Sequence, residues 1–174
     1  MELISAEVRK NSVYELLESV DDPELPISII DLGIVKDISV SNKTIHIRLI
    51  PTFSGCPALE YIEDLVKKTI EKIHTNMNVY VDWDFNGDWG AELISKKGVT
   101  KLQEFGIAVA LNNHVNCPYC NSVHAVQETV FGTTLCREIY YCKTCKNPFE
   151  KMKHLKNKTL AITSNKKIFK NLVI

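Results

Sequence analysis

Two neighbouring runs of the chain, residues 34–40 (IVKDISV) and 44–50 (TIHIRLI), alternate between apolar and polar residues. Alternation with a period of two is typical of strands with one buried face, so these runs predict a β-hairpin that turns at Ser41-Asn42-Lys43. Residues 78–85 (NVYVDWDF) alternate in the same way and predict a third strand. Before that strand, apolar residues recur every three or four positions, which predicts an amphipathic helix of about four turns. These apolar positions are Leu59, Ile62, Val66, Ile70 and Ile73.

The segment before the hairpin carries a helix start signal. Ser12 and Glu15 have the S-x-x-E spacing of a capping box, which predicts a helix to about Val20, with an earlier turn from Ser5 as the alternative start. The prolines of residues 21–26 (DDPELP) then end the helix, because the residue before a proline avoids the helical region.

Four of the six cysteines form two matched C-x-x-C pairs, Cys117/Cys120 and Cys142/Cys145, separated by 21 residues. Two residues between ligands let a tight turn aim two thiolates at one tetrahedral ion, and a second pair completes a four-sulfur site. The segments VHAVQETVF and REIYY between the pairs predict a hairpin, so this unit is expected to be a zinc ribbon. Iron would also fit four thiolates. A module this small depends on its metal for folding.

The order of these elements predicts an α+β fold in several parts. Ser95 and Gly106 mark the cap and the stop of a short helix, which we expect in a connector packed on the first domain. The cysteine-rich unit starts near Val115. The predicted parts are a helix–hairpin–helix–strand domain (residues 1–88), a helical connector (89–114), a zinc ribbon (115–153) and a basic tail (154–174).

A further cysteine, Cys56, stands between Gly55 and Pro57 at the start of the predicted second helix. Pro57 suits a first helical position, which would place Cys56 at or beside the cap, where free N–H groups and the helix dipole favour a thiolate. Such a thiol could attack a substrate or bind metal, although a lone loop cysteine is more often structural. Asp22 and Glu24, at the end of the first helix, could lie near a metal or a partner, or could be solvated.

The sixth cysteine, Cys136, has no partner at ligand spacing. It is interpreted either as a buried structural thiol or as a spare ligand beside the ribbon metal. His114, His124 and His154 are also near the ribbon in sequence, but four thiolates already saturate zinc. They are therefore taken as surface residues.

Charge is distributed unevenly along a chain with no net charge. Residues 1–110 hold 18 acidic and 11 basic residues, whereas residues 151–174 hold seven lysines and no acid. The basic segment could bind nucleic acid or an anionic membrane, but a solvated tail is the simpler interpretation. The sequence contains neither an apolar run long enough to span a bilayer nor a secretory signal, so we expect a cytoplasmic protein with reduced cysteines.

Several motifs together resemble a known family. DDPELPISIIDLGIVKDISV and PTFSGCPA are similar to the domain shared by SufT-like and eukaryotic cytosolic iron–sulfur assembly targeting factors. Later segments are similar to the PaaD proteins of phenylacetyl-CoA oxygenase systems. These segments are residues 88–108, the C-P-x-C start of the ribbon, FGTTLC and YYCKTCKNPFEKMK. The resemblance covers about residues 10–153.

This resemblance implies a non-catalytic accessory factor of aerobic phenylacetate degradation, which matures the metal centres of the oxygenase and reductase subunits. It implies that Cys56 handles iron or a transient iron–sulfur cluster, and it matches Asp22, Glu24 and Asp31 to acidic motif positions. The ribbon would be a docking module. Because one thiol cannot hold a cluster, a homodimer, a second protein ligand or a small thiol would have to supply the rest.

Two other function classes stay open. In a cysteine-dependent enzyme acting on a thioester, Cys56 would be the nucleophile, and His46 or His74 would be the candidate base. In a nucleic-acid-binding protein, the ribbon and the basic tail would contact phosphates, although the acidic first domain opposes this.

Overall fold

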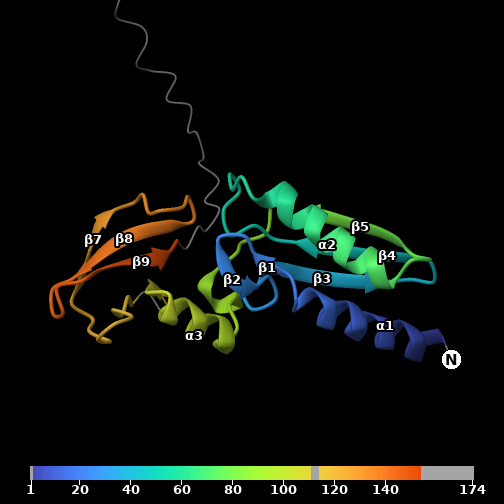
Figure 1. Ribbon diagram of the computed structural model, residues 1–174, viewed down its shortest axis with the longest axis horizontal. Helices are drawn as coiled ribbons and strands as arrows, with labels where there is room; N and C mark the ends of the chain where they lie inside the picture. Colours follow the sequence, from blue (N-terminus) through green and yellow to red (C-terminus); the bar gives the residue numbers. More distant parts are fainter. Residues whose placement is uncertain (1, 111–113, 154–174) are drawn as a thin grey trace, which may run out of the picture.

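The computed structural model describes residues 2–110 and 114–153; the predicted basic tail and His154 lie outside the described residues. Figure 1 shows an elongated arrangement, with a sheet and two long helices at one end and the cysteine-rich sheet at the other. The predicted α+β class is confirmed. Within the described residues, every helix is too short or too polar to cross a lipid bilayer.

The first sheet contains the three predicted strands in the order β3-β4-β5. The hairpin prediction is confirmed, because β3 (Val35–Val40) pairs antiparallel with β4 (Thr44–Leu49). The third strand, β5 (Asn78–Trp83), pairs parallel with β4. Parallel neighbours need a crossover connection, and the predicted amphipathic helix, α2 (Leu59–Ile73), supplies it.

Two helices cover one face of this sheet. The first helix, α1 (Glu2–Leu17), contacts both β3 and α2, and α2 contacts β5. Alternate residues of β4, such as Ile45 and Ile47, are fully buried, whereas His46 between them is part-exposed. On α2 the buried residues are Ile62, Val66 and Ile70. The period-two and period-3.6 patterns therefore identified the faces that meet in the core.

The capping-box prediction at Ser12 is wrong. The helix begins at Glu2 and continues through Ser12 and Glu15 to Leu17. Val13 and Leu17 lie four residues apart on the same helix face, and both are fully buried. This packing stabilises the second half of α1, so the S-x-x-E pair is helix interior and not a cap.

A small hairpin and a connector helix lie between the two ends. β1 (Asp21–Asp22) and β2 (Leu25–Ser28) pair antiparallel. A 3-10 turn (Ala91–Leu93) then leads to α3 (Lys96–Glu104). The predicted cap is confirmed, because Ser95 Oγ accepts a hydrogen bond from the Gly98 N–H at 2.9 Å.

Two glycines of the predicted motifs have left-handed backbone. Gly33 has φ +68°, and a Cβ there would lie 2.4 Å from the carbonyl oxygen of Leu93. Gly33 therefore lets the D-L-G turn pack against the segment before α3. Gly106, with φ +71°, stands just after α3, as predicted for its stop.

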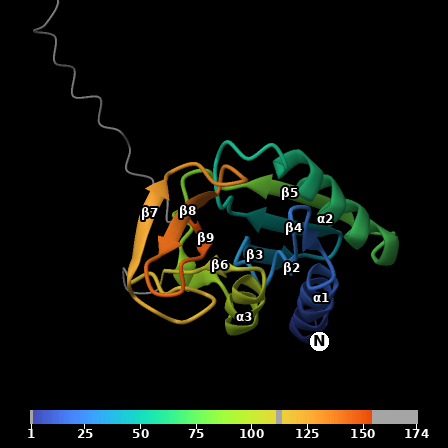
Figure 2. The ribbon, with the colours of Figure 1, turned by 60° about the vertical axis from the view of Figure 1, so that its left-hand side comes forward.

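The cysteine-rich sheet has the strand order β6-β9-β8-β7. The predicted hairpin of β7 (Ala125–Thr129) and β8 (Arg137–Cys142) is confirmed. β9 (Pro148–Met152) pairs antiparallel with β8, and β6 (Ile107–Ala108) pairs parallel with β9. The strand β6 belongs to the stretch that the sequence assigned to the connector. Figure 2 shows this sheet beside α3.

One hydrophobic cluster joins the two ends of the molecule. It contains the buried face of β4, Leu102 of α3, and Ile107 and Met152 at the edge of the cysteine-rich sheet. Cys136 packs against the same cluster. The ribbon thus rests on the first domain through shared core residues, which sets the position of the Cys136 loop relative to that domain.

Candidate metal centre and interdomain thiol site

The sulfur atoms of Cys117, Cys120, Cys142 and Cys145 all lie within 4.8 Å of one another. The Sγ atoms of Cys117 and Cys145 are 3.6 Å apart, as are those of Cys120 and Cys142. Four converging thiols match the tetrahedral sulfur site of a structural metal. The structure therefore brings together the four predicted ribbon ligands.

The two C-x-x-C turns are copies of each other in backbone geometry. Cys117 C=O accepts a hydrogen bond from Asn121 N–H at 2.8 Å, and Cys142 C=O accepts one from Lys146 N–H at 2.9 Å. Asn121 and Lys146, each directly after the second cysteine of its pair, have φ values of 57° and 60°. In each turn, this left-handed residue reverses the backbone toward the first cysteine of the pair.

Backbone N–H groups also point at these sulfurs. The pKa of Cys142 is lowered chiefly because the N–H of Cys145 donates to its sulfur, and the N–H of Thr144 adds to this effect. A lowered pKa favours the thiolate, which is the metal-binding form. Burial raises the pKa of the Cys117 thiol instead, and a bound cation would favour the thiolate form of all four cysteines. Four converging thiols fit a thiophilic divalent ion.

Cys56 lies one turn before α2 and not at its cap. The N-cap is Ala58, so the prediction of Pro57 at the first helical position is wrong by two residues. The Ala58 N–H donates to Cys56 Sγ at 3.4 Å, and the Cys56 N–H donates to the Phe53 carbonyl at 3.1 Å. The thiol thus accepts a bond from the helix start while remaining half-buried.

Cys56 opens onto a cleft of about 230 Å³ between the first domain and the ribbon. Glu24, from the β1–β2 hairpin, lines the first domain's side of this cleft with Cys56 and Pro57. The ribbon's side is the loop between β7 and β8. Its lining residues are Gly132, Thr133, Thr134, Leu135 and Cys136.

The pKa of the Cys56 thiol is raised, which contradicts the thiolate predicted from the helix dipole. Burial is the main cause, and the negative charges of Glu24 and Asp22 and the neighbouring Cys136 add to it. The hydrogen bond from Ala58 opposes the shift without overcoming it. A cation or a metal in the cleft would reverse this balance, because it favours the ionised sulfur.

We therefore expect slow alkylation of Cys56 in the metal-free cleft. Its rate with iodoacetamide should keep rising with pH above the range in which a free cysteine levels off, since only the thiolate reacts. Peptide mass spectrometry against pH measures this rate. A plateau below the pH at which free cysteine levels off would contradict a raised Cys56 pKa.

The predicted acidic residues separate into two groups. Glu24 lines the cleft, and Asp22 Oδ1 accepts a hydrogen bond from the Glu24 N–H at 2.9 Å. Burial raises the pKa of Asp22, although this hydrogen bond lowers it in part. The arrangement turns the β1–β2 hairpin tip so that the Glu24 side chain faces the ribbon.

Asp31 makes its contacts at the start of α3 and does not line the cleft. Its Oδ1 accepts a hydrogen bond from Ser95 Oγ at 2.6 Å, and Lys97 Nζ lies 3.3 Å from its Oδ2. Burial opposes ionisation, but these two partners hold the pKa of Asp31 below its usual value. The acid of the D-L-G motif therefore ties the connector helix to the first domain.

The position of Cys136 is what sequence reasoning missed. It does not stand beside the four ribbon sulfurs but lines the Cys56 cleft, half-buried, with Thr134 Oγ1 at 3.1 Å from its Sγ. The prediction of a spare ligand at the ribbon metal is wrong, because this loop lies at the far end of the β7–β8 hairpin from the C-x-x-C turns. Cys56 and Cys136 are 80 residues apart, and no local pattern links them.

The two candidate bases for Cys56 lie elsewhere. His46 is on β4, where its Nε2 pairs with Asp82 of the neighbouring strand. His74 follows the last residue of α2, at the opposite end of a 15-residue helix that is about 22 Å long. None of the described residues that line the cleft is a histidine. The geometry does not support a cysteine–histidine pair.

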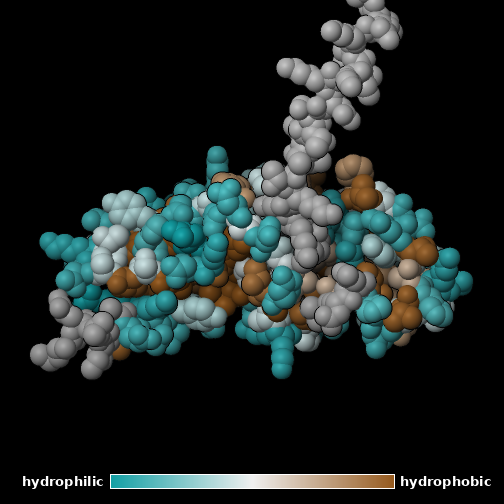
Figure 3. All heavy atoms as spheres, turned by 180° about the vertical axis from the view of Figure 1, so that it is seen from behind, coloured by the Kyte–Doolittle hydropathy of each residue, from teal (hydrophilic) through white to brown (hydrophobic). Residues whose placement is uncertain are grey.

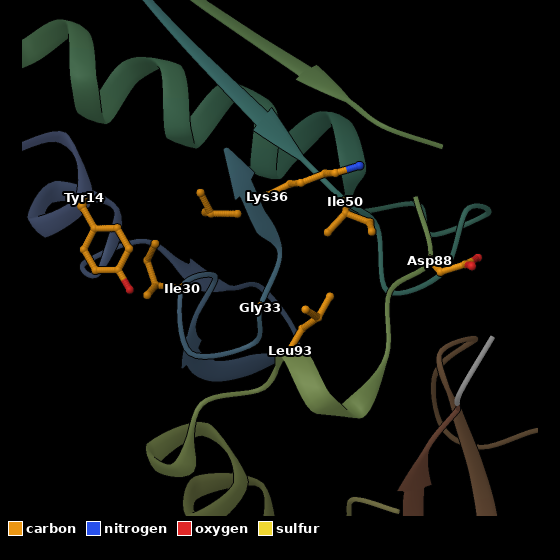
Figure 4. A pocket seen from close by; sticks show the side chains of 8 residues that line it. Tyr14, Ile30, Gly33, Lys36, Ile50, Asp88 and Leu93 are labelled. Atoms are coloured by element: carbon orange, nitrogen blue, oxygen red, sulfur yellow. The ribbon is translucent and has the colours of Figure 1, made fainter. Parts of the chain in front are cut away.

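A larger cavity of about 380 Å³ lies beside the D-L-G turn. Figure 4 shows Tyr14, Lys36 and Asp88 around it, together with the apolar side chains of Ile30 and Leu93. Lys36 is paired with Asp84. This cavity contains no cysteine, so it offers no site for thiophilic metal chemistry.

Comparison with known families divides the chain in two. The model of an iron–sulfur cluster assembly protein matches residues 10–83, and that of a PaaD zinc beta ribbon domain matches residues 107–153. A crystal structure of a domain of unknown function, DUF59, from Bacillus anthracis shares 32% identity. The match covers 55% of this chain and 92% of the chain in that crystal structure, with a TM-score of 0.53.

Curated relatives follow the same division. An Escherichia coli protein assigned as the D component of 1,2-phenylacetyl-CoA epoxidase is 31% identical over 154 residues, which cover 82% of this chain and 92% of that protein. An Fe-S protein maturation auxiliary factor from Porphyromonas gingivalis is 24% identical, and the match covers 53% of this chain and 90% of that factor. The Fe-S protein maturation auxiliary factor YitW from Bacillus subtilis is 32% identical, and the match covers 52% of this chain and 89% of YitW.

Proposed function

Because the chain belongs to the PaaD family of phenylacetyl-CoA epoxidase components, which join an iron–sulfur assembly domain to a zinc ribbon, we propose that it matures metal centres of that oxygenase system. It would be an accessory protein and not the catalyst of ring oxidation. Its clients would be the oxygenase and reductase subunits, and its cargo would be iron or an iron–sulfur cluster. The observation that carries this proposal is the half-buried Cys56 thiol in a cleft between the two domains.

Cys56 would be the ligand that receives the cargo. A thiolate is the protein ligand that iron–sulfur clusters favour, and iron in the cleft would offset the burial and negative charge that keep the thiol protonated. Glu24, which lines the same cleft, and the adjacent Asp22 would contribute a negative potential that attracts iron cations. For Asp31 we propose a supporting role, since its contacts orient α3.

The ribbon would hold zinc through its four cysteines and dock the client. Several large apolar side chains of the ribbon are exposed, and two flank the cleft: Phe131, 70% exposed, and Leu135, 48% exposed. Figure 3 shows hydrophobic side chains on the surface at the ribbon end of the molecule. An exposed apolar group beside a reactive site is typical of a surface that another protein covers.

Replacing Cys56 with serine tests the proposal. We expect Cys56→Ser to fold and to retain the ribbon's metal, because serine is close in size and can accept the same Ala58 hydrogen bond. Client subunits co-produced with this variant should contain as little iron, and show as little oxygenase activity, as clients produced alone. Both quantities are measured on the purified client.

The matched control is Ser54→Ala, an exposed position in the same loop, which should support maturation as the wild type does. Full client activity with Cys56→Ser would contradict a role for this thiol. Thioester turnover by the pure protein, abolished by alkylation of Cys56, would favour the enzyme alternative. Salt-sensitive binding of DNA or RNA that is lost when residues 151–174 are deleted would favour the nucleic-acid alternative.

A further inference from the structure

The loop that carries Cys136 is held in place by hydrogen bonds within the ribbon. Gly132 N–H donates to the Arg137 carbonyl at 3.0 Å, and Thr133 N–H donates to Glu150 Oε1 at 2.7 Å. A Cβ on Gly132 would lie 2.9 Å from that Glu150 oxygen and from the Arg137 backbone, so the loop requires glycine there. Cys136 is thus presented to the cleft by an ordered turn.

An ion pair across the cleft fixes the two thiols relative to each other. Arg137, directly after Cys136, donates from Nη1 to Glu150 at 2.7 Å, and its Nη2 lies 3.7 Å from Glu24 Oε2. Its side chain is 9% exposed. Lys153 adds a second contact, because its backbone N–H donates to the Cys136 carbonyl at 2.9 Å and its ammonium group lies over the Phe53 ring. Both domains therefore position the cleft.

The cleft contains thiols from both domains. Cys56 and Cys136 are each half-buried. We propose that Cys56 and Cys136 of one chain together hold an iron–sulfur cluster between the two domains, with the remaining iron positions open to thiols of the client. This inference rests on the proposed function and identifies the second ligand that a single thiol lacks.

The spacing of the cleft's ligands favours a cluster over a single ion. Among the described residues, only the four ribbon sulfurs form a group of three or more potential ligands whose atoms all lie within 4.8 Å. Cys56, Cys136 and Glu24 do not form such a group. A cluster binds its thiolates on different irons, so it accepts a wider spacing. The cleft, about 230 Å³, also exceeds several-fold the roughly 30 Å³ that one water molecule occupies.

Cys136 is a better second ligand than Glu24. The Glu24 carboxylate is engaged with Arg137, whereas the Cys136 thiol makes a weak contact with the Thr134 hydroxyl. Thiolate is also the softer donor and the usual protein ligand of iron–sulfur clusters. Arg137 would then offset part of the negative charge that two thiolates and a cluster place in the cleft.

The test is anaerobic loading of the full chain with ferric iron and sulfide, in the wild type, Cys56→Ser, Cys136→Ser and the control Ser54→Ala. Iron, sulfide and zinc per chain are measured after gel filtration, and the native mass gives the number of chains per cluster. Losing even a supporting partner of a metal ligand costs about 10–100-fold in affinity, so each serine variant should lose at least about tenfold in cluster affinity. Ser54 is exposed in the Cys56 loop and does not line the cleft, so Ser54→Ala should bind a cluster as the wild type does.

The outcomes separate this inference from the proposed function. Loss in both serine variants, with one cluster on a single wild-type chain, supports it. Loss only in Cys56→Ser, or one cluster shared by two chains, overturns the role of Cys136 and leaves the proposed function standing. If the wild type binds iron without sulfide, the cluster inference fails and the proposed function stands; if it binds neither iron nor a cluster beyond the ribbon's metal, both fail.

A second readout needs no variant. Loading the wild type should protect both Cys56 and Cys136 from iodoacetamide, as measured by peptide mass spectrometry. Protection of Cys56 alone would overturn the inference.

Discussion

Removal of the metal from the four-cysteine site should unfold the ribbon and leave the first domain folded. The ribbon's own core is small, formed by Ala108, Cys117, Cys142 and Phe149, and two of these four are predicted metal ligands. Structural zinc contributes about 10–16 kcal/mol in zinc-finger peptides, far more than this core can replace. Hydrogen exchange after chelation, or in Cys142→Ser, should show lost protection in residues 125–152 and retained protection in residues 34–83.

A matched control distinguishes the effect of losing the metal from the effect of replacing any cysteine of the ribbon. Cys136→Ser makes the same chemical change in the same ribbon but away from the four sulfurs, so it should retain one metal ion per chain. We expect that ion to be zinc, which metal analysis of the purified protein would identify. Unchanged protection of β7–β9 in the metal-free protein would contradict a metal-dependent ribbon.

Replacement of Arg137 by leucine should destabilise the contact between the domains. The guanidinium is almost fully buried between Glu150 on the ribbon and Glu24 on the first domain, and its Nε also donates to Thr134 at 2.8 Å. Removing one partner of a buried ion pair costs about 3–5 kcal/mol, because the remaining charges are left unpaired. Glu24 is one-third exposed, so most of this cost comes from Glu150. A fall in Tm of roughly 10 °C follows for a chain of this size.

Lys151→Met provides the control for this variant. Lys151 is as buried as Arg137, but it pairs with Glu138 of the neighbouring ribbon strand and not with the first domain. Both variants should lower the Tm. Only Arg137→Leu should increase hydrogen exchange in residues 21–28, the hairpin whose Glu24 lines the cleft, and reduce cluster retention. Wild-type exchange in these residues would show that Arg137 stabilises the ribbon alone.

The first domain could largely be predicted from local patterns. Alternation identified β3, β4 and β5, and the recurrence of apolar residues identified α2, because one-sided burial leaves its period in the sequence. The failures were at element starts. The S-x-x-E pair lies inside α1, and Pro57 precedes the N-cap of α2, since packing of Val13 and Leu17 and the turn at Cys56 set these boundaries.

The metal centre was equally predictable, because both ligands of each C-x-x-C pair are local and the two pairs share one spacing. The thiol cleft was not. The sequence identified Cys56, Glu24 and the FGTTLC segment separately, but only the shared core around Ile107 and Met152 brings the ribbon loop over the first domain.

The sequence by itself therefore determined most strands and helices and the clustering of the four ribbon cysteines, since each depends on neighbours within a few residues or on a repeated spacing. The tertiary structure alone decided that Asp31 orients α3, that the Cys56 pKa is raised, and that Cys136 lines the Cys56 cleft and not the ribbon centre. These features depend on burial and on charges from distant segments, and contacts of that kind leave no periodic signal in a single chain.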